Sequence, residues 1–487
     1  MKIYLLNPPY IVDGRELPKF HRCTRWQGIV SRGGTYWYPI WLSYAAGVIE
    51  SKGHNVRLVD APALNWNMGD LIEDFKDFNP DIFVIETNFA SLENDIKISK
   101  ELKDISGSLS IMVGPATSQF SDKILDGGVD VVAKFEFDFT INDVVEAIEN
   151  GEGLEGVRGI SYMKNDMIMD NPERDYITSE ELDQIPFVSR VYKEHLSVDD
   201  YLLSHTLHPM VQIFTGRGCP NHCTFCSWPK TLMGREYRIR SVENILDEFE
   251  YVSNELPEVN EIFIEDDTFT IDENRIKDFC IQIKERNLDM NWSCNSRVSL
   301  SYDTMKLMKE AGCRLLDVGF ESGDERILKN IKKGITTEDS RRFMKDAKRA
   351  DLLILGDFVF GLPGETKESA ERTIQFVKEI KPNIVQFAVA TPIPGTEFYD
   401  WIIENNYCLV NDLGESIDEN GFQKCIISYP DFTKEDIEAY VDKALKTYYL
   451  SASYVPIALN TILRKNGLHE LKSMIGSSKI LLNYLNR

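Results

Sequence analysis

The sequence predicts an α/β protein with two parallel-sheet domains, followed by a mainly helical C-terminal region. Over residues 1–150, five short β-branched apolar runs alternate with helical patterns, and six further units of this kind follow between 206 and 400. Residues 401–487 are rich in tyrosine and carry mostly helical patterns. Strands that alternate with helices favour parallel sheets, because each crossover between parallel strands needs a helix.

The first domain is expected at residues 1–150 as a doubly wound, Rossmann-like sheet. We expect strands at 2–6, 56–60, 81–87, 109–114 and 129–135, with helices at 41–53, 68–78, 91–104 and 118–128. Ligands of such sheets bind at the carboxyl ends of the strands. The residues at these ends are Asn7, Pro8, Asp60, Thr87, Ser91 and Gly114.

A connector is expected at 151–205 and a partial (β/α)6 barrel, open on one side, at 206–400. Within the connector, "GISYMKNDMIMD" (159–170) predicts a hairpin that turns at Asn165 and Asp166. The chemistry of such a barrel is expected at the carboxyl ends of its strands. Residues 401–487 are expected to cover the open side, and Ser241 is a suitable N-cap for the helix that begins "SVENIL".

Composition excludes several functional classes. The net charge of -24 would repel a phosphate backbone, so no nucleic-acid partner is expected. The nine cysteines are odd in number and irregularly spaced, which favours a reduced, cytoplasmic setting over a secreted disulfide framework. No apolar run approaches the length of a membrane span, so no transmembrane segment is expected. For the basic, amphipathic end at 463–487, a packed helix is favoured over contact with a membrane surface.

Three of the cysteines lie together in "GRGCPNHCTFCSWPK" (216–230), directly after the first strand of the predicted barrel. Thiolates bind iron–sulfur clusters and zinc, and both kinds of site ordinarily take four protein ligands. The missing ligand could be a distant cysteine, with Cys294 and Cys313 as candidates. Alternatively, a 4Fe-4S cluster could leave one iron open for a small molecule. The spacing favours the open-iron cluster, with zinc or unliganded core cysteines as the alternatives.

This CxxxCxxC loop resembles the signature of the radical S-adenosylmethionine (SAM) superfamily. Further stretches resemble the motifs of that superfamily in the same order, namely "IFIEDDTFT", "NSRV", "VGFESGDERIL", "GDFVFGLPGET" and "ATPIPGTEFY". The resemblance implies that Cys219, Cys223 and Cys226 ligate a 4Fe-4S cluster whose open iron binds SAM. The SAM contacts that it implies are Phe225, Glu265, Asp266, Asp267, Arg297, Glu321, Ser322, Gly361 and Pro394. It also implies reductive cleavage of SAM to a 5′-deoxyadenosyl radical, with a flavodoxin or ferredoxin-type electron donor.

The first domain resembles the cobalamin-binding domain of cobalamin-dependent radical SAM proteins, through "LNPP", "GHNVRLVDAP", "ETNFAS" and "VGPA". In the better-known DxHxxG motif a histidine reaches cobalt, but here Pro62 follows Asp60 and Ala61, so no histidine from this loop is expected. The cobalamin contacts that the resemblance implies are Asn7, Pro8, Asp60, Ala61, Thr87, Ser91, Gly114 and Pro115. The role of "KFEFDFT" (134–140) stays open, and a purely structural domain is the alternative.

An aromatic stretch at 33–50, with Tyr36, Trp37 and Tyr38, predicts either a core-facing helix entry or an aromatic wall over the corrin or substrate. This stretch resembles the ring-contracting protein of hopanoid side-chain biosynthesis and the anaerobic magnesium-protoporphyrin ester cyclase group. The leading functional hypothesis is methylation of an unactivated carbon in a small-molecule or lipid-linked substrate. Radical rearrangement or cyclisation is the second hypothesis, and a non-catalytic cobalamin-binding protein is the third.

Overall fold

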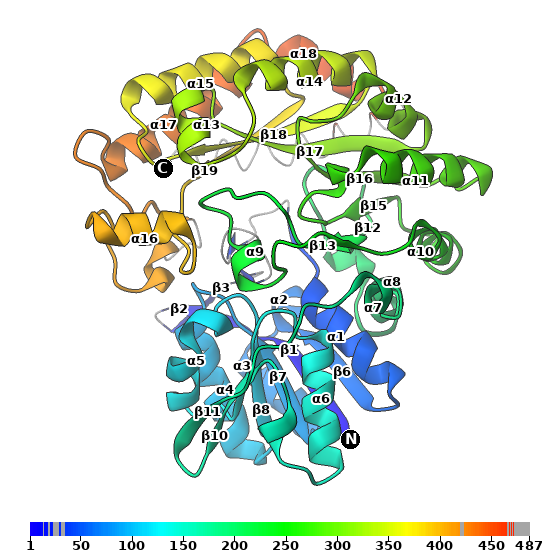
Figure 1. The fold of residues 1–487 in the computed structure, drawn as a ribbon, viewed down its shortest axis with the longest axis vertical. Helices are drawn as coiled ribbons and strands as arrows, with labels where there is room; N and C mark the ends of the chain where they lie inside the picture. The colour runs from blue at the N-terminus through cyan, green and yellow to red at the C-terminus, as the bar shows by residue number, and fades with distance from the viewer. Residues whose placement is uncertain are drawn as a thin grey trace.

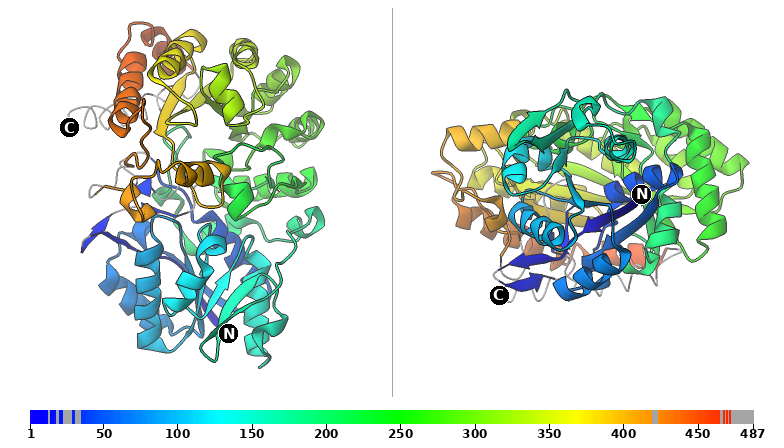
Figure 2. Two further views of the ribbon diagram at one scale, coloured as in Figure 1. Left: turned by 60° about the vertical axis from the view of Figure 1, so that its left-hand side comes forward. Right: turned by 90° about the horizontal axis from the view of Figure 1, so that it is seen from below.

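The computed structural model describes residues 1–12, 14–17, 20–22, 29–30, 35–418, 423–464, 467, 469 and 471. Two sheet domains are stacked end to end, and the loop that carries the three cysteines runs between them (Figure 1). The same stacking is visible after rotation, with the helices of the second domain on its outer side (Figure 2). Residues 472–487, most of the basic terminal segment, lie outside the described part.

The first sheet has the strand order β11-β10-β9-β8-β7-β1-β6. Its parallel strands are β1 (Lys2–Asn7), β6 (Asn55–Asp60), β7 (Ile82–Glu86), β8 (Leu109–Val113) and β9 (Val131–Ala133). The helices are α1 (Ile40–Ser51), α2 (Ala61–Leu64), α3 (Met68–Phe78), α4 (Leu92–Ser106), α5 (Thr117–Asp126) and α6 (Asp138–Glu149). One face of β1 packs in a core with α1 and α6, and the other packs with α3, α4 and α5. The predicted doubly wound fold is confirmed.

The predicted hairpin is present, and it adds two strands to the first sheet. β10 (Ile160–Lys164) and β11 (Met167–Asp170) pair with each other, and β10 pairs antiparallel with β9. Asn165 and Asp166 form the turn with φ angles of 50° and 60°, a left-handed conformation that these two residue types tolerate well. The connector then continues through α7 (Ser179–Leu182) and α8 (Val188–His195).

The second sheet is a six-stranded open barrel of order β12-β15-β16-β17-β18-β19, parallel throughout. Its strands are β12 (Met210–Ile213), β15 (Glu261–Ile264), β16 (Asn291–Ser296), β17 (Cys313–Glu321), β18 (Leu353–Phe360) and β19 (Ile384–Val389). The helices between them are α10 (Val242–Glu255), α11 (Glu273–Glu285), α12 (Tyr302–Glu310), α13 (Glu325–Asn330), α14 (Thr337–Arg349) and α15 (Lys367–Ile380). The Ser241 hydroxyl accepts a hydrogen bond from the Asn244 amide, as its predicted N-cap role requires.

The C-terminal region packs against the exposed edge of this barrel. It contains α16 (Glu397–Glu404), α17 (Lys434–Tyr449) and α18 (Val455–Ile462). The Tyr449 hydroxyl accepts a hydrogen bond from the Val385 amide (2.8 Å) and donates one to the Val385 carbonyl (2.7 Å). The Tyr449 side chain thus makes hydrogen bonds with the edge strand β19 that a neighbouring strand would otherwise make. None of the helices in the described part of the chain combines the length and the apolar character that crossing a membrane requires.

The remaining short elements connect these layers. They are β2 (Tyr10–Val12), β3 (Arg15–Leu17), β4 (Phe20–His21), β5 (Ile29–Val30), β13 (Gly216–Arg217), β14 (Arg238–Ile239) and α9 (Trp228–Thr231). β13 and β14 form a two-stranded ribbon that flanks the cysteine loop. This ribbon holds the loop between the two domains (Figure 1).

Candidate functional site

The cysteine loop is held in place by its own backbone and by one glycine. Gly218 has φ +87°, and a Cβ there would lie 1.9 Å from the carbonyl oxygen of Glu236, so only glycine fits. The Cys219 amide donates to the Gly234 carbonyl (3.3 Å), and the Thr224 amide donates to the Ile331 carbonyl (3.0 Å). The loop therefore begins at a position that requires glycine and is fixed to two separate segments of the barrel.

The sulfur atoms of Cys219, Cys223 and Cys226 are spread too widely for one zinc ion. In the described part of the chain, the ligand atoms of Glu50, Glu194 and His195 form the one metal-ligating group that lies within a mutual 4.8 Å. Three thiolates on one tetrahedral zinc lie about 3.8 Å apart, given Zn–S bonds of about 2.3 Å. A cluster spreads its thiolates over different irons, so the wider spacing favours a cluster over zinc.

Within the described part of the chain, no fourth cysteine lines the cavity around the loop. The cysteines that line the cavity around the loop are Cys219, Cys223 and Cys226, among the residues that the structure describes. Cys294 is completely buried, and burial together with its contact to Cys313 raises the pKa of its thiol well above the usual value. Burial likewise raises the pKa of Cys280. Cys294 and Cys313 are buried and neither lines the cavity around the loop, so the structure does not support either as a distant fourth ligand.

Five of the nine predicted SAM contacts line this cavity together with the cysteines. They are Phe225 from the loop, Glu265 and Asp267 after β15, Arg297 after β16, and Glu321 at the end of β17. They come from successive strand ends, which explains how residues almost 100 positions apart converge. We call this space the cysteine cavity; its lining also includes Lys333, Asp317, Asp357 and His205.

The other four predicted SAM contacts do not line the cysteine cavity. The Asp266 carboxylate turns back and accepts hydrogen bonds from the Thr215 amide and hydroxyl, both at 2.6 Å. The Ser322 hydroxyl is hydrogen-bonded to that of Thr373 (3.1 Å). Gly361 donates its amide to Glu365 (2.5 Å), and Pro394 lies away from the lining. The sequence motifs locate these residues at strand ends without specifying which way each side chain points.

Glu321 has a left-handed backbone conformation, and its buried carboxylate pairs with a lysine. Its φ angle is +65°, a conformation that costs a non-glycine residue on the order of 1 kcal/mol. The Lys333 ammonium donates to Glu321 Oε1 at 2.6 Å, and Glu321 Oε2 has no partner among the residues described. Burial acts to lower the pKa of Lys333, but Glu321 and Cys223 outweigh it and raise this pKa. The motif search missed Lys333, and no local sequence signal marks it.

At the carboxyl edge of the first sheet, Asp60 is fully buried among hydrogen-bond donors. It accepts from the hydroxyls of Tyr36 (2.7 Å) and Tyr201 (3.1 Å) and from the side-chain amide of Asn7 (2.8 Å). Burial raises the pKa of Asp60 to about 6, and these hydrogen bonds oppose the rise. Two tyrosines and an asparagine therefore satisfy the buried carboxylate of Asp60.

A second buried network lies beside Asp60, around the Arg22–Asp95 ion pair. Arg22 donates to both carboxylate oxygens of Asp95 (2.6 and 3.0 Å), and also to Asn7 (2.8 Å) and to the Pro8 carbonyl (2.6 Å). The Ser91 hydroxyl donates to Asp95 at 2.5 Å. Arg22, which the sequence analysis did not identify, thus holds the predicted cobalamin contacts Asn7 and Pro8 directly, and Asp95 holds Ser91.

Two further features at this edge fit a bound polar cofactor. Gly114 has φ +111°, and a Cβ there would lie 2.3 Å from the Thr87 carbonyl, so glycine permits the loops after β7 and β8 to touch. The Thr87 hydroxyl is buried and has no hydrogen-bond partner among the residues described. Ala61 and Pro115, next to Asp60 and Gly114, are also buried. A buried polar atom without a partner is costly, and a bound group can supply the partner.

The two domains are joined directly at the cysteine loop. Arg217, two residues before Cys219, donates to both oxygens of Asp138 (2.8 and 2.9 Å). Glu136 accepts from Arg238 at 2.6 Å and lies 3.4 Å from Arg217. All four side chains are buried. The stretch 134–140, whose role the sequence left open, is therefore the surface of the first domain that binds the cysteine loop.

The aromatic stretch reaches the same junction. The Tyr38 hydroxyl donates to the Met210 carbonyl (2.8 Å), and Trp41 lies 4.8 Å from the Arg217 guanidinium. Trp37 lines the cysteine cavity itself. Tyr36 and Tyr38 are buried, as the core-facing helix entry requires, and Trp37 is the one of the three aromatic residues that lines the cavity.

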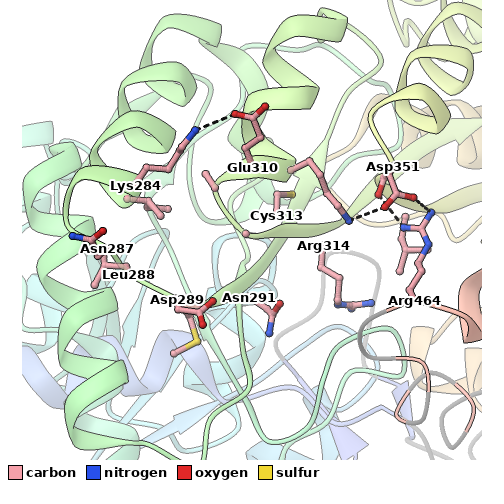
Figure 3. A pocket seen from close by; sticks show the side chains of 16 residues that line it. Lys284, Asn287, Leu288, Asp289, Asn291, Glu310, Cys313, Arg314, Asp351 and Arg464 are labelled. Carbon is pink, nitrogen blue, oxygen red and sulfur yellow. Dashed lines mark hydrogen bonds and ion pairs between the residues drawn. The ribbon is translucent and has the colours of Figure 1, made fainter.

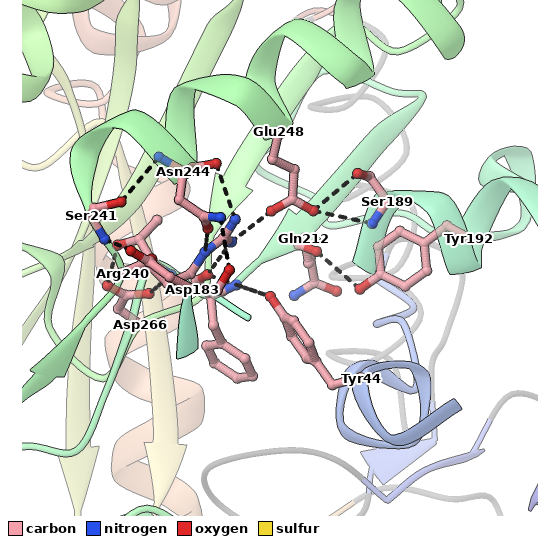
Figure 4. A network of polar contacts seen from close by, with 12 residues as sticks. Tyr44, Asp183, Ser189, Tyr192, Gln212, Arg240, Ser241, Asn244, Glu248 and Asp266 are labelled. Carbon is pink, nitrogen blue, oxygen red and sulfur yellow. Dashed lines mark hydrogen bonds and ion pairs between the residues drawn. The ribbon is translucent and has the colours of Figure 1, made fainter. Parts of the chain in front are cut away.

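Two further arginines near the cysteine loop, Arg235 and Arg240, differ in their contacts. Arg235 donates to the Asn221 carbonyl within the cysteine loop. Arg240 is instead paired with Glu248 (2.6 Å), which also accepts from Ser189, while Tyr44 of α1 accepts from the Phe214 amide (2.9 Å) (Figure 4). This buried network fixes the end of β12 and leaves Arg240 no role toward a ligand.

A larger hollow of about 580 Å³ lies at the amino ends of β16 and β17, and none of the three loop cysteines lines it (Figure 3). Its charged side chains pair with one another, Lys284 with Glu310 (3.0 Å) and Arg464 with Asp351 (2.7 Å). The amino ends of barrel strands serve stability and not chemistry. The smaller cysteine cavity is the candidate functional site because it gathers the three loop cysteines and five of the predicted SAM contacts.

Comparison with known proteins agrees with this geometry. Residues 213–377 match the family model of the radical SAM superfamily, and residues 26–145 match that of the B12 binding domain. An uncharacterised methyltransferase of Pyrococcus horikoshii is 32% identical over 423 residues, covering 86% of this chain and 89% of the relative. The chain belongs to the cobalamin-dependent radical SAM family.

This radical SAM chain is also similar to a cyclase and to a solved methyltransferase. The anaerobic magnesium-protoporphyrin IX monomethyl ester cyclase of Rubrivivax gelatinosus is 25% identical, covering 87% of this chain and 72% of the cyclase. The radical SAM methyltransferase TsrM of Kitasatospora setae, solved with cobalamin and a [4Fe-4S] cluster, shows the same fold. Its TM-score is 0.69 at 16% identity, over 91% of this chain and 90% of TsrM. The predicted family, fold class, enzymatic character and cofactors are confirmed.

Proposed function

We propose that this radical SAM enzyme methylates an unactivated carbon of a small-molecule or lipid-linked substrate. One observation carries the proposal. Trp37, which belongs to the B12-binding domain, lines the same cavity as the three cysteines of the barrel. A substrate in this cavity can face the cobalamin edge and the cluster at once, which transfer of a methyl group to a carbon radical requires.

The chain's own contribution is to hold these groups and to exclude water. When bound, the reduced cluster and SAM supply a 5′-deoxyadenosyl radical that abstracts a hydrogen atom, and cobalamin supplies the methyl group. Cys219, Cys223 and Cys226 anchor the cluster. Phe225 and Trp37 shield the cavity, because a carbon radical must be kept away from water and side reactions. The ion pair between Arg217 and Asp138 keeps the cluster loop in register with the B12-binding domain.

The cavity offers each polar part of SAM a partner of opposite charge. We propose that Glu265 and Asp267 accept hydrogen bonds from the SAM ammonium group. Arg297 and Lys333 are the cations that the lining provides for the SAM carboxylate. Glu321 Oε2 is the acceptor available to the ribose hydroxyls. Asp266 and Ser322 then act indirectly, by fixing, through Thr215 and Thr373, the strand ends that carry Glu265, Asp267 and Glu321. Gly361 and Pro394 follow the ends of β18 and β19.

For cobalamin, the proposed contacts follow the carboxyl edge of the first sheet. Thr87 supplies a buried hydroxyl, and the loops that contain Ala61 and Gly114–Pro115 supply a close backbone surface. Asn7, Pro8, Asp60 and Ser91 support this edge through their hydrogen bonds to one another, to the tyrosines and to Arg22. Because Pro62 follows Ala61, no histidine from this loop reaches the cobalt.

The enzyme needs a reductant as well as a substrate. We propose a flavodoxin or a ferredoxin-type protein as the electron donor, in a cytoplasmic, reducing setting that keeps the cysteines reduced. We also propose domain boundaries near 150, 205 and 400, with the hairpin packed onto the first domain as its two outer strands.

Label transfer tests the proposal and separates it from its rivals. The reconstituted enzyme is incubated anaerobically with titanium(III) citrate, cobalamin, methyl-labelled SAM, and small-molecule or lipid fractions of the producing cells. A product that carries the label, formed together with 5′-deoxyadenosine, supports methylation. 5′-Deoxyadenosine with an unlabelled new product supports rearrangement or cyclisation, and no 5′-deoxyadenosine at all supports a non-catalytic role. Either of the last two results overturns the proposal.

A further inference from the structure

Positive charge is concentrated around the cysteine loop in an otherwise acidic chain. The loop and the helix after it, residues 219–236, contain two Lys or Arg residues and one Glu. Residues 326–333 contain four Lys or Arg residues and no acidic residue. The two segments together hold six cations and one carboxylate, whereas the whole chain has 54 Lys and Arg against 78 Asp and Glu. Their charge is thus the reverse of the chain's overall balance.

The structure brings these segments together at Thr224, within the cysteine loop. The Thr224 amide donates to the Ile331 carbonyl (3.0 Å), and the Thr224 carbonyl accepts from the Phe398 amide (3.0 Å). The residues next to these two partners, Lys332 and Glu397, form an ion pair at 2.6 Å. About half of each side chain is exposed, 55% for the lysine and 47% for the glutamate. The pair therefore lies at the protein surface beside the loop.

Two further cations lie close to this ion pair. Lys230 of α9 is exposed, and the half-buried Arg235 donates to the Asn221 carbonyl of the loop. The hydrogen bond from Lys332 lowers the pKa of Glu397, and the charges of the two further cations lower it as well. Three cations thus act on one carboxylate, and a positive charge remains. We call Lys230, Arg235 and Lys332 the basic patch.

The basic patch lies close to the predicted cluster ligands. Lys230 follows Cys226 by four residues, so their Cα atoms are at most about 14 Å apart. Cys226 is the most exposed of the three loop cysteines, since Cys219 and Cys223 are buried. A protein bound at the patch would therefore lie next to the cluster ligands, and electron transfer between two proteins requires such closeness.

We propose that the basic patch is the docking surface for the reductant, a small redox protein with an acidic surface. The net charge of -24 repels such a protein from most of the enzyme, whereas the patch attracts it and orients it onto the cysteine loop. The step moves one electron: the donor is oxidised by one electron, the cluster is reduced by one electron, and no bond or proton is exchanged. This inference rests on the proposed function in taking a protein as the electron donor, and it adds the surface at which that protein binds.

Binding of the donor is measured first, without turnover. The probes are an acidic flavodoxin and an acidic ferredoxin, both oxidised, and each is titrated anaerobically into the reconstituted enzyme by isothermal titration at low ionic strength. The probe that binds more tightly is used in the later steps. We expect the double variant Lys230→Glu with Lys332→Glu to raise its Kd at least about tenfold, because the reversed charges repel an acidic protein. If neither probe binds the wild type, the proposal is overturned.

A matched control and a variant of opposite sign locate the binding. Lys284→Glu reverses a similarly exposed lysine that pairs with Glu310 at 3.0 Å outside the patch, and it should leave the Kd unchanged. Glu397→Gln removes the carboxylate among the three cations, so it should lower the Kd at least about twofold. Equal Kd values in the double variant and the control overturn the proposal, and so does a raised Kd in Glu397→Gln. Should the double variant fail to take up a cluster, Glu397→Gln decides the test, and an unchanged Kd then counts against the proposal.

Formation of 5′-deoxyadenosine then separates docking from chemistry. Titanium(III) citrate reduces the cluster without a protein partner, so the wild type and the double variant should cleave SAM at similar rates with this reductant. With the reduced donor protein, kept below its wild-type Kd, the double variant should be at least about fivefold slower. Equal rates with the donor protein contradict the proposal, and so does equal slowing with both reductants at an intact cluster content. Because SAM cleavage is measured, a failure of methyl transfer leaves this outcome intact, and the two proposals can fail separately.

Discussion

The contact between Arg217 and Asp138 provides the sharpest stability prediction. Replacement of Asp138 by alanine leaves the guanidinium of Arg217 buried, with 1% of its side chain exposed and with Glu136 3.4 Å away as its remaining carboxylate. Removal of one partner of a buried ion pair costs about 3–5 kcal/mol. Since Glu136 remains and Trp41 lies 4.8 Å from the guanidinium, we expect a loss of about 3 kcal/mol, at the low end of that range.

A double-mutant cycle measures this contribution. The free energy of unfolding in urea is compared for the wild type, Asp138→Ala, Arg217→Met and the double variant. The double variant removes both charges, so its loss should be smaller than the sum of the two single losses by at least about 1.5 kcal/mol. The control is Arg158→Ala, which breaks an exposed pair with Asp175 at 3.7 Å and should cost less than about 1 kcal/mol. Additive single effects, or an Asp138→Ala loss no larger than that of the control, would refute the reasoning.

Two further predictions concern the two cofactor edges. Burial raises the pKa of Asp60 to about 6, whereas the aspartate of the unfolded chain titrates near pH 4. The folded state therefore binds this proton more tightly than the unfolded state does. The stability that the proton contributes is present below pH 4 and is lost as the pH rises to 6. Relative to that of the wild type, the free energy of unfolding of Asp60→Asn in urea should therefore rise by about 3 kcal/mol as the pH goes from 4 to 7. A difference between the two proteins that does not change with pH would contradict the assignment. Gly218→Ala should lower the iron and sulfide content of the reconstituted protein at least fivefold, because its Cβ would collide with the Glu236 carbonyl. Gly53→Ala has nearly the same φ, +88°, with open space around it, and should reconstitute normally; equal cluster content in both variants would show that the collision is unimportant.

Much of the fold follows from patterns that are local in the sequence. The β-branched runs and amphipathic helices mark β1, β6 to β9 and the six barrel strands, because side-chain periodicity reports which faces are buried. The spacing of Cys219, Cys223 and Cys226 likewise identifies the cluster loop without structural knowledge. These signals need no partner from elsewhere in the chain.

What the sequence could not show depends on pairs that are distant in the chain. Arg217 and Asp138 are 79 residues apart, and neither belongs to a recognisable motif. Asp317 and Asp357 read as ordinary polar residues within two strands, and only the barrel brings them together. The motifs also placed Asp266 and Ser322 at the right strand ends, but the direction of a side chain depends on its neighbours. Their hydrogen bonds to Thr215 and Thr373 decide it.

The most direct test of the central claim compares three proteins for cluster content and SAM cleavage. The wild type, Cys223→Ala and Cys294→Ala are reconstituted anaerobically, reduced, and assayed for iron, sulfide and 5′-deoxyadenosine. With three loop cysteines as the complete set of protein ligands, the wild type and Cys294→Ala should form 5′-deoxyadenosine at similar rates, and Cys223→Ala should form none. Retained cleavage in Cys223→Ala, or loss of the cluster in Cys294→Ala, would contradict the three-cysteine, open-iron site.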